Sequence, residues 1–191
     1  MLPLLRALVP LRSREMLLDV SVLICTRDRS EMLDDCLRSV LACLPPPAEV
    51  VVVDQSRDEA TRKVACLHQG GRVPVKYIRG EGFGLSRAKN QGIAGCTASV
   101  IAFTDDDCRV DPGWVEALTG PLRCGEAGAA VGRTLPGRSV PGAEETFAVS
   151  APEGRPGFSR RTHPWRVGGG GNFAASRKVL LEAGDYDERF G

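Results

Sequence analysis

Three consecutive aspartates, Asp105, Asp106 and Asp107, follow an apolar segment that has the length of a β-strand. Carboxylates placed so close together repel one another, and a bound divalent cation would relieve that repulsion. In an extended segment Asp105 and Asp107 point to the same side, so that one can hold a cation while the other meets a neighbouring ligand group. Carboxylate oxygens suit Mg²⁺ or Mn²⁺, which keep ligand positions for water and for substrate phosphates. The alternative interpretation is a solvated acidic turn or a helix cap.

Two other apolar segments also end in polar residues. Thr26 and Arg27 follow residues 20–25, and Asp54 follows residues 49–53. In open parallel sheets, ligands bind beyond the carboxyl ends of the strands. We therefore expect these residues and the aspartate triplet to form one ligand site. Taken alone, Asp54 could equally cap a turn.

A glycine-rich turn at residues 80–84 leads into a segment with helical spacing. Near the start of that segment lie Arg87, Lys89 and Asn90. Backbone amides and cations at such a helix N-terminus can hold a diphosphate, although the same residues could be ordinary surface charge. A second glycine run, residues 168–171, would let the backbone approach a ligand closely or would serve as a flexible linker.

The elements that must position these residues follow from the hydrophobic pattern. Runs that are apolar throughout predict buried strands, and apolar residues that recur every three or four positions predict helices. Ser30 is the expected N-cap of the first helix. Because strands alternate with helices, the sequence predicts an α/β fold whose mostly parallel sheet carries helices on both faces. The expected strands are 20–25, 49–53, 75–78, 99–103 and 127–134, and the expected helices are 30–44, 58–68, 86–94, 113–122 and 176–183.

One domain, residues 19–191, accounts for most of the chain. Residues 1–18 are expected to form an N-terminal extension, whose apolar run is too short and too interrupted by arginines to span a bilayer. This extension is either frayed or makes a short amphipathic contact with a membrane surface. Residues 136–171 are rich in glycine, proline and serine and show no sustained period, which predicts a variable loop.

The charges of the 191-residue chain nearly cancel, with 25 basic and 24 acidic residues and a net charge of +1. A general nucleic-acid-binding protein would carry a basic excess, so nucleic acid is not an expected partner. The seven cysteines include no pair with the spacing of a zinc knuckle or a redox motif. Such cysteines are typical of a reducing compartment and predict a cytoplasmic protein, either free or at the inner face of the membrane.

In order along the chain, these pieces resemble the family-2 glycosyltransferases of the GT-A fold. Together the matching segments span residues 20–191 in the family's own order. No single motif decides the resemblance, which depends on the order and spacing of all of them. The segments are VSVLICTRDRSEMLDDCLRSV, EVVVVDQSRD, GEGFGLSRAKNQGI, VIAFTDDDCRVDPGWVEAL and GGGGNFAASRKVLLEAGDYDERFG.

The resemblance implies roles for several residues in a nucleotide-sugar site. The base of a nucleoside diphosphate would contact Thr26 and Asp54, with Arg27 close by. Lys89 and Asn90 would lie along the nucleotide sugar.

Further roles concern the diphosphate and sugar end of the implied site. Asp105 would face the ribose or the sugar, and Asp107 would hold Mn²⁺ or Mg²⁺ on the diphosphate. Asp106 occupies the variable middle position of an Asp-x-Asp motif and is assigned no direct role. The sugar and acceptor side matches a glycine-rich loop that contains Gly170, Gly171 and Asn172.

The resemblance also implies the reaction: transfer of a sugar, with inversion, from a nucleoside-diphosphate sugar to a hydroxyl of a sugar, lipid-linked or other acceptor. UDP-sugars are the commonest donors. A carboxylate takes the acceptor's proton while the metal stabilises the leaving diphosphate. The family's base is the aspartate of a Glu-Asp pair, which we expect beyond Gly191. Asp185, Asp187 and Glu188 belong to the preceding motif and are not expected to act as the base.

Two other functions fit parts of the pattern. A non-catalytic module could bind a nucleotide sugar with the same fold, and the lack of a Glu-Asp pair after residue 188 favours it. A nucleotidyltransferase would also use paired carboxylates and a metal. The residues after the first strand, however, do not form the glycine-rich loop bearing arginine or lysine that such an enzyme would need.

Overall fold

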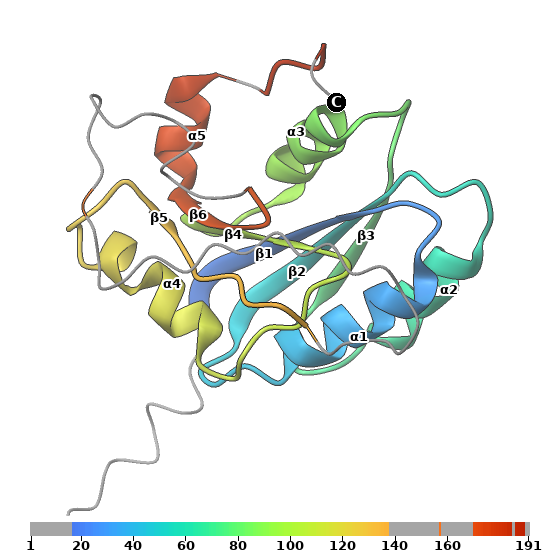
Figure 1. Cartoon of the computed structure of the whole chain (residues 1–191), viewed down its shortest axis with the longest axis horizontal. Helices are drawn as coiled ribbons and strands as arrows, with labels where there is room; N and C mark the ends of the chain where they lie inside the picture. Colours follow the sequence, from blue (N-terminus) through green and yellow to red (C-terminus); the bar gives the residue numbers. More distant parts are fainter. Residues whose placement is uncertain (1–16, 138–156, 158–169, 185, 190–191) are drawn as a thin grey trace, which may run out of the picture.

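A six-stranded sheet forms the centre of the molecule (Figure 1). The structure is a computed structural model that describes residues 17–137, 157, 170–184 and 186–189. The strand order is β3-β2-β1-β4-β6-β5, and most neighbours run parallel, which confirms the predicted α/β fold. The strands are β1 (Leu18–Thr26), β2 (Pro47–Asp54), β3 (Val75–Arg79), β4 (Val100–Asp105), β5 (Ala129–Val131) and β6 (Asn172–Ser176).

Helices cover both faces of the sheet, as predicted (Figure 1). On one face lie α1 (Ser30–Leu41), α2 (Ala60–Leu67) and α4 (Trp114–Arg123), and on the other lie α3 (Leu85–Gly95) and α5 (Arg177–Ala183). With both faces covered, the central strands are apolar throughout because their side chains are buried on each side in turn.

Two separate apolar clusters hold the helices on the sheet. Leu33, Leu37 and Val40 of α1 recur at helical spacing and pack on the first face of the sheet. Ala88 and Ile93 of α3 pack on the second face with residues of β1, β2 and β4. The helices therefore fix how the loops at their ends are presented at the sheet edge.

Strand β6 was not predicted from the sequence. It pairs antiparallel with β4 on one side and with β5 on the other. Its sequence, NFAAS, is short and contains no β-branched residue, so local propensity gives little signal. The segment is a strand because it has a hydrogen-bonding partner on each side.

Two predicted details of the first helix are wrong. Arg29, not Ser30, takes the N-cap position, and no side-chain hydrogen bond caps this end. The helix stops at Leu41 instead of continuing to residue 44. The backbone amide of Leu44 donates instead to the carbonyl of Pro112, 2.8 Å away. A contact with the segment before α4 thus replaces the expected last turn.

Other bounds differ modestly from the prediction. β1 begins at Leu18, which is buried, so the strand includes the last residue of the expected extension. Residues 1–16 and most of the predicted loop 136–171 lie outside the described residues. None of the helices in the described part of the chain has the length and apolar character needed to cross a membrane.

A buried carboxylate ties together the amino-terminal ends of the strands. Glu49 Oε1 accepts hydrogen bonds from Ser21 Oγ at 2.6 Å and from the amide and hydroxyl of Thr97 at 2.7 and 2.9 Å. Lys76 Nζ lies 2.5 Å from Oε2. Burial alone would raise the pKa of Glu49, but the hydrogen bonds from Lys76, Ser21 and Thr97 outweigh that effect and lower the pKa to about 2. Glu49 therefore joins three strands and the segment before β4.

Candidate functional site

The polar strand ends meet at one edge of the sheet. Thr26 is in register with Asp54 between β1 and β2, and Cys25 is in register with Asp105 between β1 and β4. Parallel strands that end at the same level bring their following loops together. The structure thus confirms the expected grouping of these strand ends.

The aspartate triplet forms a tight turn at the end of β4. Asp105 is the last residue of the strand, and Asp106 and Asp107 lie in the turn that follows. One ligand atom from each of Asp105, Asp107 and Cys108 lies within 4.8 Å of the others, so this set could hold a metal ion. Asp105 and Asp107 converge as expected, although a turn and not an extended segment brings them together.

Charge and burial perturb the groups of this turn. Burial raises the pKa of Asp105; Lys89 opposes that rise, and the neighbouring Asp107 and Asp106 add to it. Burial and the carboxylates of Asp107 and Asp105 raise the pKa of the Cys108 thiol to about 11. Near neutral pH Cys108 is therefore a neutral thiol, and the negative charge of the cluster comes from its carboxylates.

Asp106 has a structural role, although its middle place in the Asp-x-Asp motif did not indicate one. Its side chain is buried, and Thr26 Oγ1 donates a hydrogen bond to Asp106 Oδ2 at 2.7 Å. Arg29 Nη1 donates to Asp106 Oδ1 at 3.2 Å and lies 3.4 Å from Asp107 Oδ2. The hydroxyl of Thr26 is thus engaged inside the protein, and its contact with a base remains a prediction.

Asp54 is fully buried at the end of β2. Its Oδ1 accepts from the amide of Ser56 at 2.8 Å, and its Oδ2 accepts from the hydroxyl of Tyr77 at 2.8 Å. Arg79 Nη1 lies 3.6 Å from Oδ2. The carboxylate therefore holds the ends of β2 and β3 together, and its predicted contact with a base has not been tested.

Lys89 places a cation beside the aspartate turn. Its side chain is 8% exposed, and Nζ faces the rings of Tyr186 at 5.4 Å and Phe103 at 5.9 Å. Among the described residues no carboxylate forms an ion pair with Lys89, although the lysine lies near enough to lower the pKa of Asp105. A buried ammonium in contact with two ring faces is thus directed toward the acidic turn.

The glycines predicted for the sugar side lie directly on these charged groups. A Cβ at Gly171 would collide with the carboxylate of Asp105, and a Cβ at Gly170 would lie 3.2 Å from Lys89 Nζ. At residue 171 a side chain would have to displace the carboxylate of Asp105, whereas at residue 170 a small shift of the Lys89 side chain would be enough. Gly170 and Gly171 therefore belong to the same group as Asp105 and Lys89.

Asn90 and Asn172 use their side chains to join elements. Asn90 Nδ2 donates to the carbonyl of Tyr186 at 3.0 Å, and the amide of Tyr186 donates back to Oδ1 at 2.9 Å. Asn172 Oδ1 accepts from Trp114 Nε1 at 2.9 Å, and its Nδ2 donates to the carbonyl of Arg133 at 2.8 Å. Their predicted positions along the donor and at the acceptor side remain predictions.

Tyr186 is a residue of this region that sequence reasoning missed. Asn90 holds its backbone on α3, and Arg87 Nε contacts Glu188 Oε2 at 2.8 Å in the same segment. The YDER sequence was visible, but nothing in its spacing indicated that the ring packs against Lys89. Hydrogen bonds from Arg87 lower the pKa of Glu188, and those from Arg189 lower the pKa of Asp187. That neither carboxylate acts as the base remains a prediction.

The loop between β1 and α1 borders the same edge. Asp28 has a positive φ of 55°, its amide donates to Ser56 Oγ at 2.7 Å, and its carboxylate accepts from the amide of Arg57 at 2.9 Å. Arg27 lies over the ring of Phe83, with 4.7 Å between the guanidinium carbon and the ring centroid. Arg27 thus connects the loop between β1 and α1 to the loop between β3 and α3, at the carboxyl edge of the sheet.

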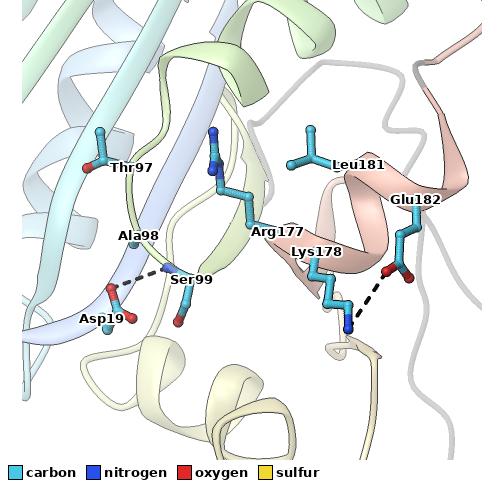
Figure 2. A pocket seen from close by; sticks show the side chains of 8 residues that line it. All are labelled: Asp19, Thr97, Ala98, Ser99, Arg177, Lys178, Leu181 and Glu182. Carbon is cyan, nitrogen blue, oxygen red and sulfur yellow. Dashed lines mark hydrogen bonds and ion pairs between the residues drawn. The ribbon is translucent and has the colours of Figure 1, made fainter.

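A separate pocket of about 580 Å³ lies at the opposite edge of the sheet (Figure 2). Lys178 pairs with Glu182 at 3.8 Å and Asp19 accepts from the amide of Ser99 at 3.3 Å, whereas the buried Nε of Arg177 has no hydrogen-bond partner among the described residues. It contains none of the predicted site residues. The candidate site is therefore the carboxyl edge of the sheet and not this pocket.

Comparison with known proteins assigns the chain to a family. The model of glycosyl transferase family 2 matches residues 21–183, so the chain belongs to that family. A glucosyl-dolichyl phosphate glucuronosyltransferase from Haloferax volcanii is 30% identical over 180 residues, which cover 90% of this chain and 57% of that protein. Glycosyltransferase AglE from the same organism is 30% identical over 100 residues, 51% of this chain and 33% of AglE. This chain thus spans little more than half the length of the glucuronosyltransferase and a smaller part of AglE.

Solved structures share the fold at low sequence identity. S. aureus TarS (1–349) in complex with UDP superposes with a TM-score of 0.65 at 17% identity, covering 89% of this chain and 50% of that one. A mannosyltransferase from Pyrobaculum calidifontis in complex with GDP-mannose and Mn²⁺ gives a TM-score of 0.63 at 18% identity, covering 89% and 48%. These neighbours are GT-A glycosyltransferases, which confirms the predicted fold class.

Proposed function

We propose that this chain is the donor-binding part of a glycosyltransferase and that a nucleoside-diphosphate sugar binds across the carboxyl edge of the sheet. Lys89 carries the proposal. A buried ammonium normally has an anionic partner, because burial without one costs free energy. Among the described residues Lys89 forms no ion pair; its Nζ faces two aromatic rings and lies near Asp105 of the acidic turn. A diphosphate would supply the missing negative charge.

The aspartate turn suits the divalent cation that would accompany a diphosphate. The ligand atoms of Asp105, Asp107 and Cys108 converge within 4.8 Å. The two carboxylates supply hard oxygen ligands, which match Mg²⁺ or Mn²⁺ better than a thiol does. When bound, such an ion would neutralise the diphosphate and stabilise it as a leaving group. The Pyrobaculum calidifontis neighbour, which contains Mn²⁺, supports this assignment.

The remaining site residues would then orient the donor. Asp54 ends β2, which lies one strand beyond β1 from the metal turn, and Thr26 ends β1 between them. The base would lie over these two strand ends. Gly170 and Gly171 bring backbone onto Lys89 and Asp105, and the sugar would lie at that end of the site. The family resemblance favours UDP-sugars, and neighbours with UDP and with GDP-mannose support a nucleoside-diphosphate donor.

The reaction we propose is inverting transfer to an acceptor hydroxyl. A base must take the acceptor's proton, and we do not assign that role to Asp187 or Glu188, whose carboxylates are paired with Arg189 and Arg87. The relative from Haloferax volcanii is named for a dolichyl phosphate-linked glucose, which supports a lipid-linked sugar acceptor. An acceptor of that kind would bring the protein to the inner face of a membrane.

Saturation-transfer NMR with a panel of UDP-, GDP- and dTDP-sugars in the presence of the diamagnetic ion Mg²⁺ tests the proposal. We expect one donor class to show transfer to its base and ribose protons. Asp107→Asn should abolish the signal, while Asp111→Asn, an exposed aspartate in the same segment, should retain it. If no nucleotide sugar gives a signal with the unsubstituted protein, the proposed function is wrong.

A further inference from the structure

One guanidinium nitrogen bridges two aspartates of the metal turn. Arg29 Nη1 lies 3.2 Å from Asp106 Oδ1 and 3.4 Å from Asp107 Oδ2. The two carboxylates differ, because Asp106 is 6% exposed and Asp107 is 49% exposed at the side chain. Arg29 thus has one buried anchor and one exposed partner.

Asp106 keeps the guanidinium in place independently of Asp107. Its carboxylate is fixed by the hydroxyl of Thr26, which donates to the oxygen that Arg29 does not use. Arg29 also occupies the N-cap position of α1, so its backbone is fixed by the helix. The side chain can lose Asp107 and still keep its bond to Asp106.

The loop that carries Arg29 connects the two ends of the candidate site. On one side Asp28 is bonded to Ser56 and Arg57, directly after Asp54. On the other side Arg29 is bonded to Asp106 and Asp107. Two consecutive residues, Asp28 and Arg29, therefore link the aspartate turn to the loop at the end of β2 by hydrogen bonds.

A divalent cation and Arg29 compete for the same carboxylate. Asp107 can neutralise the guanidinium or serve the ion, and two cations at its oxygens repel each other. The ion brings the larger charge, so it would take Asp107 and leave Arg29 paired with Asp106 alone. Arg29 then has a free N–H directed at the metal turn, where the diphosphate would lie.

We propose that Arg29 is a positioning residue that neutralises Asp107 in the metal-free protein and releases it when a divalent cation binds. The role rests on the proposed metal site. This role has two consequences for binding. Arg29 weakens the binding of the cation alone, and it strengthens the binding of a nucleoside diphosphate once the cation is present.

The test is Mn²⁺ binding by electron paramagnetic resonance, with Arg29→Gln and Arg29→Lys in the full chain. We expect Arg29→Gln to bind Mn²⁺ alone about three- to fivefold more tightly, the upper part of the effect expected for removing a competing exposed charge. Arg29→Lys keeps the positive charge and should stay within about twofold of the unsubstituted protein. Calorimetry with UDP and GDP should show that the gain in affinity on adding Mn²⁺ is smaller in Arg29→Gln. A purely structural role would weaken Mn²⁺ binding or leave it unchanged.

Arg109→Gln is the matched control, because Arg109 is an exposed arginine close to the turn that pairs with Asp35 instead. It should change Mn²⁺ affinity by less than about twofold, and an equal gain in this variant would reduce the effect to general surface charge and overturn the inference. Arg29→Met, which keeps the apolar stem, replaces Arg29→Gln if that variant does not fold. Unchanged Mn²⁺ affinity in both Arg29→Gln and Arg29→Met overturns the proposed role of Arg29 and leaves the proposed metal site standing. If the unsubstituted protein binds no Mn²⁺, the proposed metal site fails together with the inference.

Discussion

The backbone of Gly171 lies against the carboxylate of Asp105 so closely that no side chain fits between them. β6 begins at the next residue and pairs with β4, which ends at Asp105. The strand pairing therefore fixes both sides of this contact. A methyl group at position 171 must displace either the carboxylate or the backbone.

Gly171→Ala should disturb the site more than the fold. We expect a folded protein whose affinity for a nucleoside diphosphate with Mn²⁺ falls at least about tenfold, because Asp105 is pushed from its position. Gly120→Ala is the control: a Cβ there meets nothing within 4 Å, and alanine in a helix is more stable than glycine by about 0.5–1 kcal/mol. Calorimetry and thermal unfolding of both variants measure the contrast. Equal affinity of Gly171→Ala and the unsubstituted protein would show that Asp105 has no part in binding.

Lys89→Gln should remove affinity for phosphate without removing affinity for the base. A hydrogen bond to a charged group contributes about 1.5–3 kcal/mol, so UDP or GDP binding should weaken roughly ten- to hundredfold. The corresponding nucleoside, which lacks phosphates, should bind equally to both proteins. Lys63→Gln, an exposed lysine on α2, serves as the control in the same titrations. If nucleoside and nucleoside diphosphate lose affinity alike, Lys89 supports the fold and not the diphosphate.

Glu49 should make stability depend on pH in the acid range. Its pKa is about 2 in the folded protein and about 4.3 in an unfolded chain, which corresponds to about 3 kcal/mol. Because the folded pKa is the lower one, this stability is present above pH ~5 and is lost as the pH falls toward 2. Urea unfolding of Glu49→Gln should show a loss of roughly 2–3 kcal/mol at pH 7, and the difference from the unsubstituted protein should shrink on acidification. Glu126→Gln, an exposed control, should show neither effect.

Asp54→Asn should affect both stability and base recognition. The carboxylate accepts from Ser56 and Tyr77 and lies near Arg79, so the amide should lower the free energy of unfolding by about 1–3 kcal/mol. A contact with the base predicts in addition a weaker affinity for the nucleoside alone, measured by NMR titration. Asp58→Asn is the control: Asp58 is exposed, its Oδ1 accepts from the amide of Ala60, and an asparagine oxygen can accept the same bond, so neither quantity should change measurably. Unchanged nucleoside affinity in a folded Asp54→Asn protein would leave Asp54 with a structural role only.

The sequence was sufficient to predict the sheet edge because strand ends can be recognised locally. Apolar runs that stop at Thr26, Asp54 and Asp105 mark the carboxyl ends of parallel strands, and parallel strands share an edge. The convergence of Asp105 and Asp107 was also predictable, although the backbone turn that produces it was not. In each case the signal lies within a few adjacent residues.

The sequence could not predict contacts between segments far apart in the chain. Thr26 and Asp106 are 80 residues apart, and no periodicity indicates that one hydroxyl and one carboxylate meet. β6 depends on two partner strands, and the position of Tyr186 depends on Asn90, 96 residues earlier. These contacts also change the expected picture, because the side chains of Thr26, Asp54 and Asn90 each have a partner inside the protein.

The most direct test of the central claim is calorimetry of the unsubstituted chain with UDP, GDP and dTDP, with Mn²⁺ and after EDTA. We predict that one nucleotide binds only with the metal, because the carboxylates of Asp105 and Asp107 repel a diphosphate unless a cation lies between them. Asp107→Asn should lose the binding in Mn²⁺. Equal affinity with Mn²⁺ and after EDTA would contradict the proposed metal-dependent nucleotide-sugar site.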